Sequence, residues 1–306
     1  MESNLSSAQF KRIAAFAKKL RIENKISENN GKPPLISGDV LETADFTFSE
    51  FTSKEKEGDS GSLYLAKKKT DKNVRYIVKH AYTDCACNEF MYYCVSEALG
   101  LRVPKVKLFN ISKGEKRNYF KTETVAGIEY LNIIQEPRGF KDINKDKVSN
   151  WADYFGFNAL YYILCEIDSF EIVIDENNIL YKIDNAASFN LSFYWLDNIG
   201  FDFEHGGINI KETVYNQLMM TAEHSSYNSY SEKYNSVKEQ YGEEAARYFL
   251  TPFERFAQIN LEIFDDCINT LCYFYADMLG DFYKKFLKLR KEECVKFLNT
   301  IKKTCK

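Results

Sequence analysis

Alternating apolar and polar residues, the pattern of a β-strand with one buried face, recur along the first half of the chain. The predicted strands lie at residues 45–51, 62–67, 74–80, 103–111, 117–125 and 129–136. Between the third and fourth strands, residues 86–99 have helical spacing, and Gly100 after them is typical of a helix C-cap. Pro137 and Gly139 break the last predicted strand.

Helical patterns flank this strand-rich region. Residues 6–22 carry one apolar stripe at helical spacing, and residues 25–40 have the composition of a linker. Residues 150–167 are apolar on nearly all sides, which predicts a buried helix, and a short hairpin is predicted over 171–183. After a loop near 185–210, the remaining pattern is mainly helical.

This segregation of strands from helices predicts an α+β fold with two lobes and a cleft between them. A small, mostly antiparallel β lobe with one helix would precede a larger helical lobe. The predicted parts are an N-terminal helix and linker (1–44), a β-rich N-lobe (45–138) and a helical C-lobe that contains the hairpin (139–306). The chain has 306 residues, 45% of them hydrophobic, which is enough apolar material for such a core.

Charge and cysteine content exclude several classes of function. The net charge of −3 gives no field that would attract nucleic acid. The sequence shows no signal peptide and no transmembrane segment, so a cytosolic-type protein is predicted. The eight cysteines form no CxxC pair and only three histidines occur, which argues against a zinc site and indicates reduced thiols. The cluster "FDFEHGG" at 201–207 is interpreted as an exposed acidic loop rather than a metal site.

Asp184 directly follows an apolar strand. Ile179, Tyr181 and Ile183 would share one face of that strand, and small polar residues follow the aspartate. A carboxylate in this position is either a turn residue or a metal ligand at the rim of a sheet.

Three other charged residues come before Asp184 in a meaningful order. Lys79 lies late in the third predicted strand, Glu89 near the start of the helix, and Asp168 just before the hairpin. Taken singly, they have ordinary interpretations: an edge lysine, a helix-dipole glutamate and a turn aspartate. Taken together, they suit phosphoryl transfer, which needs charge neutralisation more than covalent chemistry. Lys79 would hold phosphate, Glu89 would fix Lys79 and Asp184 would bind a metal. Asp168 would act as base or orient the attacking hydroxyl.

A polar turn between the first two predicted strands completes this arrangement. The turn "EGDSGS" spans 57–62 and is a sparse glycine-rich loop. The predicted nucleotide-binding residues are Gly58, Ser60, Gly61, Lys79 and Glu136. Ser60 is not interpreted as a nucleophile, because a nucleophile elbow needs a helix after it and here a strand follows.

Three segments of the chain have a recognisable pattern: "YIVKH", "NEFMYYCVSEALGLRVPKVKLF" and "DSFEIVIDENNILYKIDNAASF". They resemble the HipA-like and phosphatidylinositol-kinase-like branch of the kinase superfamily, and the resemblance spans residues 45–200. Within this branch the chain is similar to Legionella effector kinases that host inositol hexakisphosphate regulates. The resemblance implies a two-lobed kinase-like fold, ATP with Mg²⁺ or Mn²⁺ as cofactors, and Ser or Thr of a host protein as acceptor. It also implies delivery into the host cytoplasm and inositol hexakisphosphate as an activator.

The chain departs from the pattern of that branch at the metal site. The related pattern is Asp-Arg-His with an Asn five residues after the Asp, but Ser169 and Phe170 follow Asp168, and Val173 takes the Asn position. Glu171 and Asp175 are the alternatives for a second ligand. A pseudokinase that binds nucleotide, polyphosphate or a host protein without turnover is therefore the alternative function. A third is a non-enzymatic helical adaptor whose interaction surface is the aromatic-rich region 227–280.

Basic residues concentrate at the end of the chain. Residues 281–306 carry nine Lys or Arg against three acidic residues. This segment is either a packed helix with a solvated basic face or part of a polyanion site. The residues predicted for an inositol-phosphate site are Lys105, Lys107, Lys284, Lys288, Arg290 and Lys291.

Overall fold

The computed structural model describes residues 40–51, 62–80, 83–110, 124–189, 210–223, 228–274 and 277–304. The helix predicted over 6–22, most of the linker and most of the strand predicted over 117–125 lie outside these residues.

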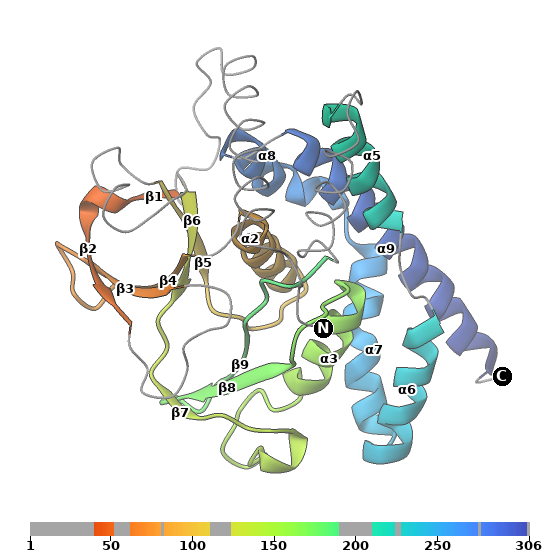
Figure 1. Cartoon of the computed structure of the whole chain (residues 1–306). Helices are drawn as coiled ribbons and strands as arrows, with labels where there is room; N and C mark the ends of the chain where they lie inside the picture. Colours follow the sequence, from red (N-terminus) through yellow and green to blue (C-terminus); the bar gives the residue numbers. More distant parts are fainter. Residues whose placement is uncertain are drawn as a thin grey trace, which may run out of the picture.

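A six-stranded sheet forms the N-terminal part, and Figure 1 shows it curling around one side of the molecule. Its strand order is β1-β5-β6-β4-β3-β2, and all pairs are antiparallel except β1 with β5. The strands are β1 (Val40–Glu42), β2 (Phe46–Glu50), β3 (Ser62–Lys68), β4 (Arg75–His80), β5 (Val106–Asn110) and β6 (Thr124–Glu129). β4 has neighbours on both sides, so Lys79 belongs to an inner strand, as predicted.

One face of this sheet packs a small aromatic cluster. Phe46 and Phe109 meet edge to face with ring centroids 4.9 Å apart, in the same buried cluster as Val78. Gly127 on β6 is required by this packing, because a Cβ there would lie 2.2 Å from the Phe109 ring. The cluster explains why aromatic and small residues alternate in these strands.

The helix α2 (Thr83–Ala98) follows β4 and ends as the sequence predicts. Gly100 has φ +71°, in the left-handed region that favours glycine. The N–H of Leu101 donates to the Ser96 carbonyl at 2.9 Å, and the N–H of Gly100 donates to the Glu97 carbonyl at 3.0 Å. These two bonds form a Schellman motif.

A second sheet lies below α2 in Figure 1. It has the antiparallel order β7-β8-β9, with strands β7 (Ile133–Gln135), β8 (Glu171–Asp175) and β9 (Leu180–Ile183). β8 and β9 form the predicted hairpin, in which Glu171 is opposite Ile183. The preceding helix α3 (Asp153–Ile163) is shorter than the predicted 150–167, since Cys165 adopts a left-handed φ of +49° and the chain leaves the helix before Asp168.

Five further helices make up the C-terminal part that the structure describes. They are α5 (Ile210–Glu223), α6 (Asn228–Tyr241), α7 (Glu243–Gln258), α8 (Asp265–Phe274) and α9 (Asp277–Thr304). The predicted α+β fold, with a β-rich part followed by a helical part, is confirmed. None of the described helices combines the length and apolar character needed to cross a membrane.

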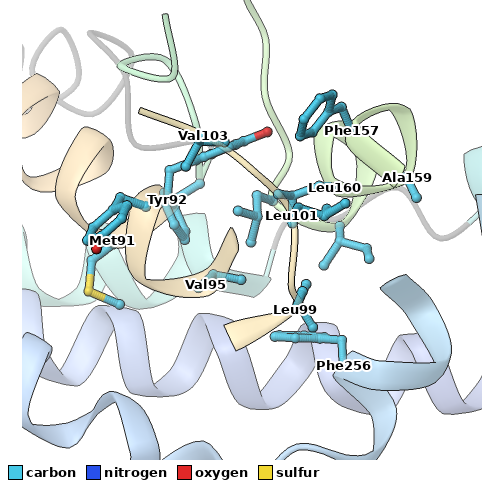
Figure 2. Packing of buried hydrophobic residues seen from close by; sticks show 14 of the residues in the cluster. Met91, Tyr92, Val95, Leu99, Leu101, Val103, Phe157, Ala159, Leu160 and Phe256 are labelled. Atoms are coloured by element: carbon cyan, nitrogen blue, oxygen red, sulfur yellow. The ribbon is translucent and has the colours of Figure 1, made fainter. Parts of the chain in front are cut away.

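A single large core joins the two parts. Figure 2 shows Val95 of α2 and the following Leu99 and Leu101 packing close to Leu160 of α3 and Phe256 of α7. Each of these side chains is at least nine-tenths buried. Because α2 belongs to this core, the helix that carries Glu89 is held firmly against the C-terminal part.

Candidate active site between α2 and the hairpin β8–β9

Asp184 lies at the end of β9, where the hairpin turns back towards α2. Its φ of +56° is left-handed, a conformation that Asp tolerates better than most residues. The side chain is half-buried. The structure therefore places this carboxylate at the rim of a sheet, as the sequence predicted.

Two adjacent polar residues of α2 hold the segment after Asp184. Glu89 is 1% exposed, and its Oε1 accepts a hydrogen bond from the backbone N–H of Asn185 at 3.3 Å. The Asn88 side-chain amide donates to the Ala186 carbonyl at 2.8 Å. Asn88 in turn accepts a hydrogen bond from the Tyr283 hydroxyl at 2.9 Å, which links α9 to the same segment. Glu89 is thus brought to Asp184, whereas the contribution of Asn88 and Tyr283 was not predicted.

Lys79 is placed by its strand alone. Its backbone pairs with Leu63 of β3 near the end of β4, the strand that directly precedes α2. The structure does not describe the Lys79 side chain, so its pairing with Glu89 stays a prediction.

Asp168 lies on the exposed loop between α3 and β8. Its Oδ1 accepts a hydrogen bond from the Ser169 N–H at 2.7 Å, and its carbonyl accepts one from the Tyr161 hydroxyl at 2.9 Å. The adjacent Ile167 N–H donates to the Ala187 carbonyl at 3.1 Å. The loop that carries Asp168 is therefore hydrogen-bonded to the segment that follows Asp184.

A buried ion pair joins the same two segments. The Lys182 ammonium lies 2.7 Å from Glu166 Oε1, and neither side chain is exposed. Burial raises the pKa of Glu166 from 4.5 to about 7, against the opposing effect of Lys182; Glu89 and Asp184 raise it further. The geometry alone would indicate a charged pair, but the direction of the pKa shift shows that desolvation outweighs the attraction of Lys182.

The face of β9 that carries Lys182 is the buried one. Ile179, Tyr181 and Ile183 share the other face and are half-buried, whereas Leu180 and Lys182 are fully buried. The reason is Glu166, which gives the lysine a partner inside the protein.

The hairpin register separates the two alternatives for a second metal ligand. Val173 is 1% exposed and opposite Tyr181, so the position expected to hold Asn is a packed apolar residue. Asp175 is at the turn end of the hairpin, where its Oδ1 accepts hydrogen bonds from the N–H groups of Asn177 and Ile179. Glu171 is at the same end as Asp184, and it accepts a hydrogen bond from the Ser169 hydroxyl at 3.0 Å.

The other predicted binding residues lie outside the described residues or on separate elements. Gly58, Ser60 and Gly61 lie outside the described residues, and Glu136 is exposed just after β7. Lys105 lies just before β5 and Lys107 within it, whereas the remaining four residues of the predicted inositol-phosphate site lie on α9.

The four basic residues on α9 differ in their surroundings. Arg290 is 1% exposed and 2.8 Å from Glu293, so its guanidinium is not on the surface as that prediction assumed. Lys284 pairs with Asp265 at 3.2 Å, and Lys291 donates to the Ile259 carbonyl at 2.6 Å. Lys288 is exposed. Convergence of these residues into one anion site stays a prediction.

Comparison with known proteins adds little to this geometry. No known protein family matches the chain, and no curated protein matches it. Among solved structures, the chain is similar to a proinflammatory kinase of Helicobacter pylori, CtkA, at 10% identity and a TM-score of 0.35, over 81% of this chain and 96% of that one. At that level of likeness, function has to be inferred from the site itself.

Proposed function

We propose that this protein is an atypical kinase that transfers the γ-phosphate of ATP. The observation that carries the proposal is the contact of the Glu89 carboxylate with the backbone N–H that follows Asp184. It brings the helix glutamate to the segment that follows the carboxylate at the end of β9. The strand that carries Lys79 directly precedes this helix, and a lysine near these carboxylates is what phosphoryl transfer would require.

The Asp184 carboxylate would supply one hard oxygen ligand to Mg²⁺ or Mn²⁺. The described residues contain no group of three or more His, Cys, Asp or Glu side chains that could hold a metal by themselves. Mg²⁺ in kinases is usually bound by one or two carboxylates together with the substrate phosphates. Such an ion would neutralise phosphate charge, while Asp168, on the exposed loop beside this segment, would orient the acceptor hydroxyl.

The acceptor we propose is a Ser or Thr of a protein. Activation by inositol hexakisphosphate and delivery into a host cell are proposals that come from the sequence resemblance.

Asp184→Asn tests the proposal. Loss of the charged ligand should lower Mg²⁺-dependent turnover of labelled ATP about a hundredfold or more, because a bound ion supplies several kcal/mol of stabilisation. The assay is run with Mg²⁺ and Mn²⁺ in turn, with and without inositol hexakisphosphate. The matched control is Asp71→Asn, in the exposed turn before β4, where Asp71 Oδ1 accepts from the Asn73 N–H at 3.0 Å. Equal turnover in Asp184→Asn and the wild type would refute the kinase assignment.

A pseudokinase is the second candidate, and Val173 favours it. A buried valine in the position of the second ligand leaves only Glu171, at the same end of the hairpin as Asp184, to supply a second carboxylate. A pseudokinase would show a nucleotide-dependent thermal shift but no turnover with either metal.

A further inference from the structure

Lys182 is fully buried two residues before Asp184, and the proposed reaction assigns it no direct step. A lysine is almost never buried without partners, so its contacts reveal what holds it there.

Its ammonium has four acceptors within hydrogen-bond distance. One is Glu166 Oε1 at 2.7 Å, on the loop before Asp168. The other three belong to the turn itself: the Ile183 carbonyl at 2.7 Å, the Asp184 carbonyl at 3.5 Å and Asn185 Oδ1 at 3.2 Å. The ammonium therefore contacts the carbonyls of the two peptide groups that flank the Asp184 Cα. Through Glu166 it also ties this turn to the loop that carries Asp168.

Stability alone does not account for this pair. A buried ion pair is often no more stable than apolar residues of the same volume, because desolvation offsets the attraction. Here the other carboxylate oxygen, Glu166 Oε2, is buried without a hydrogen-bond partner. The nearby Tyr92 hydroxyl is likewise buried without a hydrogen-bond partner. An apolar pair would avoid these desolvation costs. The advantage of a lysine here is therefore its hydrogen bonds to the turn at 183–185.

We infer that Lys182 is a positioning residue that fixes the left-handed Asp184 turn, and so the orientation of the metal-binding carboxylate. The inference rests on the proposed function of Asp184. Side chains that orient a ligand from behind typically change metal affinity or activity 10- to 100-fold when they are removed.

The test is the double variant Lys182→Met/Glu166→Met in the full chain. It removes the ion pair without leaving a buried charge, so the melting temperature should stay within about 5 °C of the wild type. The Mg²⁺ concentration for half-maximal ATP turnover should rise at least about tenfold, because the acceptors at 183–185 lose the ammonium that binds them together. The control is Lys238→Met/Glu243→Met, which removes a surface pair of the same 2.7 Å separation and should leave that Mg²⁺ concentration unchanged.

The two readouts separate positioning from a merely structural role. A folded double variant with the wild-type Mg²⁺ requirement overturns the inference while the kinase assignment stands. If the double variant does not fold, Asn185→Ala decides: it removes one acceptor of Lys182, and the Mg²⁺ requirement should rise about two- to tenfold, as for one lost hydrogen bond. An unchanged requirement in that variant overturns the inference. A wild-type protein with neither turnover nor a Mg²⁺-nucleotide thermal shift overturns both the proposed function and the inference.

Discussion

The buried carboxyl of Glu166 should make the stability of this protein depend on pH, in the direction opposite to that of an ordinary surface ion pair. Folding raises the pKa of Glu166 from 4.5 to about 7, because burial disfavours the charged form more than Lys182 favours it. The folded state then binds this proton more tightly than the unfolded state. The contribution to stability is complete below pH 4.5 and is lost as the pH rises to about 7.

The size of the effect follows from the shift. A rise in pKa from 4.5 to about 7 corresponds to about 3 kcal/mol, since a tenfold change in proton affinity is worth about 1.4 kcal/mol. Glu166→Gln keeps the shape and an acceptor but does not titrate. The free energy of unfolding of the wild type, relative to this variant, should therefore fall by about 3 kcal/mol between pH 4.5 and pH 8.

Urea unfolding at a series of pH values measures this difference. The control is Glu243→Gln, which removes the charge from a surface pair of the same length, where the change should stay below about 1 kcal/mol at every pH. If the wild type instead gains stability over Glu166→Gln as the pH rises, then Lys182 outweighs burial and the reasoning is wrong. A difference that does not change with pH would show that the carboxyl keeps its ordinary pKa in the fold.

Two further predictions concern α2. Tyr283→Phe removes the buried hydroxyl that donates to Asn88 and should lower the free energy of unfolding by about 1–2 kcal/mol in urea titrations; a neutral substitution would show that α9 does not hold α2 through this bond. Lys79→Ala and Glu89→Ala should each weaken ATP turnover, and the double variant should be little worse than the worse single variant, because residues that act as a unit are not additive. Fully additive losses in kcat/KM would mean that the two side chains do not pair.

Local patterns were enough to predict most of the elements. The strands predicted at 45–51, 62–67 and 74–80 match β2, β3 and β4 to within two residues, since alternation with a period of two records which face is buried. The Gly100 cap and the β8–β9 hairpin were also visible, because each depends on neighbouring residues. β1 was assigned to a linker, since its three residues form a strand only by pairing with the distant β5.

The candidate site was only partly predictable for the same reason. Glu89 and Asp184 could be assigned to one site because their order resembles a known layout, and the structure confirms that Glu89 of α2 contacts the segment after β9. Lys182 and Glu166 could not be identified, because a lysine inside a strand looks exposed until its partner is known. The only local signal was that a single lysine, Lys182, stands among the apolar residues of this strand.

The polar residues buried around Asp184 bear on whether this region is a site or only a scaffold. Lys182, Glu89 and Asn88 are each at most 1% exposed, and all three are hydrogen-bonded to the segment 183–186. Each buried polar group has a desolvation cost that an apolar residue of the same volume would not have. An adaptor that only needed a stable core would gain nothing from three of them on one turn. A turn that must present a carboxylate to a metal ion in a single orientation would gain from all three, and most of all where a buried valine takes the position of the second ligand. The concentration of buried polar groups at this turn therefore favours a metal-nucleotide site over a purely structural role.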